Sequence, residues 1–176
     1  EEIQIIKLPK RQVAIGHHCQ GWPFEGDSAY ALRPEENQDA KQLAWLETSL
    51  AEAKENWKIC YFHHPLYSNA ARHGSSVDLR VVLEPIFVKH GVNVVFSGHD
   101  HVYERVKPQK GIYYFVSGAA GQLRRGNMRP TDQTATYFDQ DQSFMLAEVA
   151  GNELQFQAVS RSGKIVDSGV IRRAVR

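Results

Sequence analysis

The sequence has 176 residues, of which 42% are hydrophobic and 23% are charged, a balance typical of one globular domain spanning residues 1–176. With 21 basic against 20 acidic residues the net charge is +1, so charge favours neither nucleic acid nor an anionic membrane as a partner. No stretch approaches the roughly 20 apolar residues of a membrane span, and we expect no membrane segment.

The chain begins at Glu1 without an initiator methionine or a signal-peptide pattern. We therefore expect a processed product or a piece of a longer protein. Its two cysteines, Cys19 and Cys60, are too far apart in the sequence to suggest a zinc-type cluster or to dictate a disulfide framework. None of these features predicts a cellular compartment.

The first third of the chain contains two short strands, a loop and a helix in our prediction. Apolar runs at residues 3–8 and 13–16 favour strands, and residues 17–37 hold turn-forming residues and aromatics without a period. Acidic residues then precede apolar residues that recur at three- and four-residue steps. This pattern predicts an amphipathic helix over residues 36–55.

The middle of the chain alternates strands and helices. An apolar run at residues 58–62 predicts a strand, and residues 63–75 form a polar loop. A second helix is predicted over residues 77–90, ending at Gly91, followed by a strand at 92–97. A strand, a helix and a strand in this order are typical of a unit with parallel strands.

The last part of the chain is predicted to be mainly β-structure. A long loop at residues 117–142 separates the first of its strands from three that form hairpins. The predicted strands are 112–116, 143–150, 153–160 and 164–171. The predicted fold class is therefore α/β, a mixed-sheet sandwich flanked by helices.

Histidines follow two of the predicted parallel strands. They are His63 after residues 58–62, and His99 and His101 after residues 92–97. Parallel strands end at the same edge of a sheet, where open α/β sheets place their chemistry. The glycine directly before His99 gives the chain the freedom to turn both later histidines inward. We expect these imidazoles to converge and to bind metal.

Four segments together resemble the calcineurin-like metallophosphoesterases, and most closely the purple acid phosphatases with their G-H-x-H-x-Y-E-R pattern. These segments are Gln42–Glu47, Phe62–Ser68, Ser97–Arg105 and Gly111–Ala119. The similarity covers roughly residues 38–125. It implies the C-terminal half of an αββα fold in which two sheets face each other between helices.

The resemblance also implies roles for individual residues. His63 and His99 correspond to ligands of one metal, and His101 corresponds to a ligand of the second. His73 falls where a histidine assists the leaving group or orients the substrate. The complete family site holds two ions, drawn from Fe, Zn and Mn. The variable positions of the two motifs, to which the resemblance assigns no role, are His64 and Asp100.

Part of the family pattern is absent from this sequence. The early aspartate motif and the G-N-H motif, which supply a bridging aspartate and an asparagine ligand, do not occur. Gly26–Tyr30 spells G-D-x-x-Y, but no apolar strand precedes it. We interpret it as the D-S-x-Y segment that comes before the Gln42 helix. A missing N-terminal half or a second chain is then expected to cover the exposed sheet edge.

The sequence leaves three functions open. The first is a metal-dependent phosphoesterase that hydrolyses phosphate esters with metal-bound hydroxide, either active or inactive as this chain alone. The second is a non-enzymatic remnant, or a domain completed by a partner, that binds one metal or none. The third is a hydrolase with one zinc on His63, His99 and His101. Arg124 and Arg125 either help to bind phosphate or are solvated.

Overall fold

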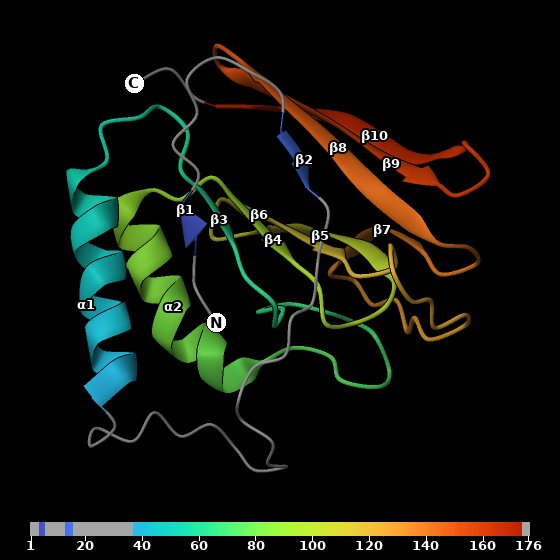
Figure 1. Ribbon diagram of the computed structural model, residues 1–176, viewed down its shortest axis with the longest axis horizontal. Helices are drawn as coiled ribbons and strands as arrows, with labels where there is room; N and C mark the ends of the chain where they lie inside the picture. The colour runs from blue at the N-terminus through green and yellow to red at the C-terminus, as the bar shows by residue number, and fades with distance from the viewer. Residues whose placement is uncertain (1–3, 6–12, 16–36, 174–176) are drawn as a thin grey trace.

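The computed structural model describes residues 4–5, 13–15 and 37–173, and Figure 1 shows their arrangement. Two helices lie side by side against one face of a six-stranded sheet, and a four-stranded sheet packs on the other face. The result is a helix layer followed by two sheet layers. The predicted α/β class and the mixed-sheet sandwich with flanking helices are both confirmed.

The two helices are α1 (Asn37–Glu52) and α2 (Val77–His90). The first ends three residues before the predicted boundary. The second ends as predicted at Gly91, which adopts the left-handed conformation with φ 67° and donates its N–H to the carbonyl oxygen of Val88. Neither helix is long and apolar enough to cross a membrane.

The six-stranded sheet has the order β1-β3-β4-β6-β5-β7. Its strands are β1 (Gln4–Ile5), β3 (Ile59–Tyr61), β4 (Val94–Ser97), β5 (Tyr103–Gln109), β6 (Ile112–Ser117) and β7 (Thr134–Phe138). Strands β3, β4 and β6 run parallel, and the other pairings are antiparallel. The parallel arrangement expected from the sequence brings the carboxyl ends of β3 and β4 together.

Two of these strands, β5 and β7, were not predicted from the sequence. Strand β5 is rich in charged residues and contains Pro108, so it lacks a regular apolar alternation. Strand β7 lies inside the segment 117–142 that we expected to be a loop. The two strands pair with each other, and β5 also pairs with β6. Tertiary pairing, which local pattern does not report, therefore decides both elements.

The four-stranded sheet has the order β10-β9-β8-β2 and is antiparallel throughout. Its strands are β2 (Val13–Ile15), β8 (Ser143–Ala150), β9 (Glu153–Ser160) and β10 (Ile165–Arg172). The predicted hairpins are present, and Gly151 and Gly163 adopt positive φ angles of 57° and 83° in their turns.

Apolar side chains fill both spaces between the layers. Leu46 and Phe87 of the helices pack against Cys60 and Tyr114 of the six-stranded sheet. The opposite face of that sheet packs on the second sheet through a separate cluster, which includes Phe96, Phe115, Met145, Leu154 and Phe156. Because both faces of the central strands are covered, β4 is buried along its whole length. This rigid strand carries the histidine turn that follows it.

Candidate metal centre

The loops that leave β3 and β4 are held side by side by backbone hydrogen bonds. The N–H of Phe62 donates to the carbonyl oxygen of Phe96 at 3.1 Å, and the N–H of Gly98 donates to that of His63 at 2.9 Å. These bonds extend the strand pairing past the last paired residues. As a result, His63 Nε2 lies 3.0 Å from His99 Nδ1.

The turn after β4 depends on His99 itself. Its φ is 61°, in the left-handed region that residues other than glycine rarely adopt. We expected Gly98 to supply the bend, and this expectation was wrong because Gly98 does not take a positive φ. Backbone strain of this kind is found most often at functional sites. It turns the imidazole of His99 back toward His63.

Three histidines form the group best suited to a metal among the described residues. Ligand nitrogens of His63, His64 and His99 all lie within 4.8 Å of one another. His64, for which we expected no role, is a member of this group. His101, which we expected to bind metal, is not a member. His73 lies beside the group, with its ring centroid 4.2 Å from that of His99.

The histidines favour the neutral state, which is the state that binds metal. Burial, reinforced by His64 and the neighbouring imidazoles, lowers the pKa of His63 to about 4 and that of His99 to about 3. Burial also lowers the pKa of His64, His73 and His101. His101 contributes to the shifts of His63 and His99, so it lies near the group without belonging to it.

A loop carrying Arg124 lies against the turn that holds His101. The N–H of Arg124 donates to the carbonyl oxygen of His101 at 3.0 Å. The Nε atom of Arg124 is buried and has no hydrogen-bond partner among the described residues, whereas Arg125 is exposed. Arg124 helps to lower the pKa of both His73 and His101, so its charge is directed toward this site.

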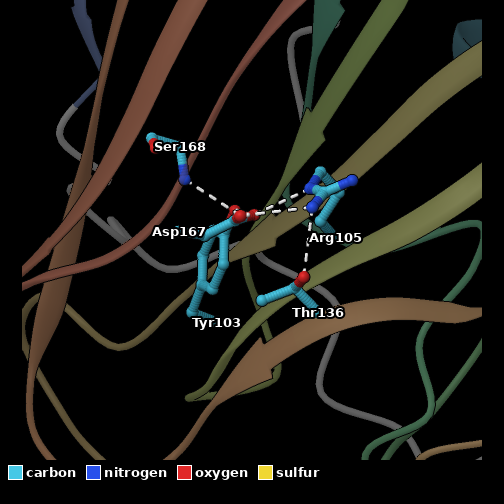
Figure 2. A network of polar contacts seen from close by, with 5 residues as sticks. All are labelled: Tyr103, Arg105, Thr136, Asp167 and Ser168. Carbon is cyan, nitrogen blue, oxygen red and sulfur yellow. Dashed lines mark hydrogen bonds and ion pairs between the residues drawn. The ribbon is translucent and has the colours of Figure 1, made fainter.

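The tyrosine and arginine of the Tyr103–Arg105 motif connect the two sheets rather than contact the histidines. Figure 2 shows that both reach Asp167 of β10. The hydroxyl of Tyr103 donates to Asp167 Oδ2 at 2.7 Å, and Arg105 donates to both carboxylate oxygens at 2.7 and 3.2 Å. Arg105 also donates to Thr136 of β7 at 3.1 Å. These contacts hold β5 against both sheets.

Glu104, the middle residue of the motif, is completely buried and stabilises the loop after β3. Its carboxylate accepts hydrogen bonds from the backbone N–H and the side-chain amide of Asn69, at 2.8 and 2.7 Å. It also accepts one from Thr134 at 2.8 Å. The motif therefore stabilises the surroundings of the histidines, because Glu104 holds the loop after β3 and the strand β7 in place.

The separation of His63 Nε2 and His99 Nδ1 is compatible with two ligands of a single ion. Two ligands on a tetrahedral zinc with bonds of about 2.0–2.1 Å lie about 3.3 Å apart, close to the 3.0 Å between His63 and His99. A pair of hard ions such as Fe and Mn needs oxygen ligands, and the histidine group contains none. Asp27, in the segment interpreted above, lies outside the described residues.

Comparisons with known proteins agree with this geometry. A family model described as calcineurin-like phosphoesterase matches residues 15–103. The human tartrate-resistant acid phosphatase type 5 is 28% identical over 149 residues, which cover 78% of this chain and 46% of that protein. Purple acid phosphatase 17 of Arabidopsis thaliana is 29% identical over 129 residues, which cover 71% of this chain and 38% of that protein.

Solved structures show the same fold. A purple acid phosphatase from yellow lupin (Lupinus luteus) seeds superimposes with a TM-score of 0.67 at 22% identity, covering 76% of this chain and 28% of that one. GAP50, the anchor in the inner membrane complex of Plasmodium, gives a TM-score of 0.70 at 20% identity, with 78% and 44% covered. The chain thus spans less than half the length of each of these four proteins.

Proposed function

Because the chain belongs to the calcineurin-like phosphoesterase family and has purple acid phosphatases among its relatives, we propose that it takes part in the hydrolysis of phosphate esters. The main support is the contact of 3.0 Å between His63 and His99 at the carboxyl edge of parallel strands. In this proposal, both bind one metal ion, and His101 belongs to the second ion of the family site. The further oxygen ligands come from outside the described residues or from a second chain.

Bound metal would supply positive charge for the phosphate oxygens and make a water acidic enough to attack near neutral pH. The chain's own residues hold and orient the ester. The Nε atom of Arg124 is buried without a hydrogen-bond partner in the described part of the chain, and Arg124 lies against the turn of His101, so it is our candidate for binding a phosphate oxygen. Arg125, which is exposed, takes no part.

His73 is our candidate for the general acid. It is exposed, it stands beside His99, and a neutral imidazole that gains a proton can pass it to the departing alkoxide. The adjacent Arg72 adds positive charge on the same side. Burial and the nearby arginines lower the pKa of His73 despite the opposing charge of Asp100, so the protonated form that can donate requires a more acidic solution than a free imidazole does.

A mononuclear zinc hydrolase is the second candidate, because three imidazole nitrogens gather within 4.8 Å without a carboxylate. A non-enzymatic domain is the third outcome; a protein described as an anchor, GAP50, has the same fold. Metal content and turnover of the full-length gene product separate the three. Two ions per chain with hydrolysis of a phosphomonoester support the dinuclear enzyme, and one zinc with hydrolysis supports the second candidate. Bound metal or none without hydrolysis would contradict both.

A further inference from the structure

Asp100 stands between His99 and His101 and is completely buried. Its carboxylate reaches the loop that carries His73 rather than solvent. The oxygen Oδ2 accepts a hydrogen bond from Ser68 Oγ at 2.7 Å and another from the backbone N–H of Gly74 at 3.1 Å. One short turn thus carries His99 and also binds, through Asp100, the loop that contains His73.

The two donors sit at the two ends of this loop, which closes on itself. Ser75 Oγ donates to the carbonyl oxygen of Ser68 at 3.2 Å and accepts the N–H of Ser68 at 3.0 Å. Gly74 adopts φ 72°, so the chain reverses there. The carboxylate of Asp100 therefore holds the two ends of the loop together at Ser68 and Gly74, and Gly74 is the residue next to His73.

The turn that contains Asp100 is itself rigid. A Cβ atom added to Gly118 would lie 2.2 Å from the carbonyl oxygen of Asp100, which shows how closely the strand end of β6 approaches this backbone. The N–H of Gly118 also donates to the carbonyl oxygen of Val102 at 3.0 Å. Asp100 is thus a fixed point from which the more exposed His73 loop is held.

We propose that Asp100 is a positioning residue for His73, and that it holds the imidazole beside His99, where the imidazole can reach the leaving group. The inference rests on the role proposed above for His73. It gives a function to the variable position of the histidine motif. Asparagine should replace Asp100 well, because its amide oxygen can accept both hydrogen bonds, whereas alanine can accept neither.

The first test follows the backbone N–H of Gly74 by hydrogen exchange in this chain. Asp100→Ala should speed its exchange roughly tenfold to a hundredfold, because the N–H loses its acceptor. Asp100→Asn should stay within about threefold of the parent. If the alanine variant does not fold, Ser68→Ala removes one of the two bonds and should give a smaller increase. Unchanged exchange at Gly74 in the folded variant would overturn the proposal.

The second test measures turnover by the full-length gene product. Asp100→Ala should lower kcat roughly tenfold to a thousandfold for phenyl phosphate and little for 2,4-dinitrophenyl phosphate, which leaves without a proton. Asp100→Asn should recover most of the loss. In the His73→Ala background, Asp100→Ala should cost little more, because the two residues act as one unit. Asp141 offers the control, since its carboxylate also accepts a backbone N–H, from Gln142, but its other partner is Arg161 rather than the His73 loop. Asp141→Ala should not change the ratio between the substrates.

Three outcomes would overturn the proposal: equal losses on both substrates, additive losses in the double variant, or loss of bound metal in Asp100→Ala. If the parent enzyme hydrolyses neither substrate, the proposed function fails. The exchange of the Gly74 N–H still decides separately whether Asp100 holds the loop.

Discussion

At the scale of single residues, His99 both contacts His63 with its ring and forms the turn after β4 with its backbone. Its left-handed backbone turns the ring toward His63, and the next residue in the same turn, Asp100, is completely buried. A residue other than glycine with φ near 60° costs of the order of 1–3 kcal/mol and persists only where its surroundings enforce that conformation. Here the hydrogen bond from Gly98 to His63 and the close approach of Gly118 enforce it. The strain is therefore stored where ligands must converge.

The identity of the third metal ligand is a prediction at this scale. The group in the structure contains His64, whereas the family resemblance assigns His101 to a metal. We predict that His63→Ala and His99→Ala each weaken Co(II) binding to this chain at least tenfold, because each removes one nitrogen of the pair. Titration followed by the visible absorption of Co(II) measures this.

His64→Ala and His101→Ala serve as the matched pair in the same titration. If the nitrogen cluster holds the ion, His64→Ala weakens binding and His101→Ala does not. The opposite result would favour the family ligand set. Binding unaffected by any of the four substitutions would contradict a metal centre here.

His73 carries a second prediction at the residue scale. In the full-length gene product, His73→Ala should lower kcat by roughly 10²–10⁴ for a poor leaving group, as loss of a general acid does. The cost should be much smaller for a good leaving group, and metal content should not change. Equal loss for both substrates would indicate that His73 positions the phosphate. Loss of metal would make it a ligand, and no loss would mean a surface histidine.

At the scale of elements, β5 connects the parts of the molecule. Side chains of Tyr103 and Arg105 reach the second sheet, while Glu104 reaches the loop after β3. The alternation of a strand therefore sends neighbouring residues of one motif to opposite faces. The burial of Glu104 is tolerated because three hydrogen bonds satisfy its carboxylate. The motif supports the site without contacting it.

Loss of Asp167 tests this connection. Asp167→Ala leaves the buried Tyr103 hydroxyl and the Arg105 guanidinium without their acceptor, and should lower the free energy of unfolding by about 3–5 kcal/mol. Urea denaturation measures it. The control is Asp141→Ala, which removes an ion pair with the exposed Arg161 and should cost less than about 1 kcal/mol. Equal effects of the two substitutions would show that the connection between the sheets is not important for stability.

A second test at this scale concerns Glu84 of α2, whose side chain is buried. Burial alone would raise its pKa, but hydrogen bonds from Lys110 and Tyr67, both at 2.6 Å, outweigh burial and lower it. A lowered folded-state pKa means that the carboxylate stabilises the fold above its ordinary pKa of 4.5. This contribution is lost as the pH falls through the folded-state value.

Glu84→Gln should therefore lower the free energy of unfolding at pH 7 by about 1–3 kcal/mol, and the difference from the parent should shrink below about pH 4. Denaturant titrations at pH 7, 5 and 3.5 measure it. Glu47→Gln removes an exposed ion pair with Lys89 and should have a much smaller effect. A pH-independent difference for Glu84→Gln would contradict the role of its charge.

At the scale of the whole molecule, helices cover one face of the six-stranded sheet and the second sheet covers the other. The outer face of the second sheet bears no described helix, and Phe144, Leu146 and Val170 are each more than 40% exposed on it. The histidine group contains no carboxylate. Both observations are consistent with a chain that spans less than half the length of its relatives.

We predict that the 176-residue chain by itself has little phosphatase activity, even with added Zn, Mn or Fe. The histidine group contains no carboxylate among the described residues, so a pair of hard ions lacks there the anionic ligands that would hold it and offset its charge. Release of 4-nitrophenol from its phosphate ester measures turnover. The full-length gene product assayed alongside is the control. A kcat of the order of 1–10³ per second from this chain alone would contradict the prediction.

The sequence by itself determined the parts of the molecule that local pattern encodes. Apolar periodicity predicted α1 and α2, continuous apolar runs predicted β3 and β4, and two turn-forming pairs that each contain one glycine predicted the last hairpins. Strand and helix order made β3 and β4 parallel, and parallel strands bring their following residues to one edge. That order predicts that His63 and His99 lie at the same edge, and the left-handed turn at His99 then brings their rings into contact.

Only the tertiary structure decided the rest, because it depends on partners that are distant in the sequence. Strands β5 and β7 exist through their pairing, and the buried charge of Glu104 is stable only beside Asn69 and Thr134. No local sequence pattern predicts the left-handed turn at His99 or the hydrogen bond between Asp100 and the His73 loop. The membership of His64 in the histidine group likewise depends on where two loops meet.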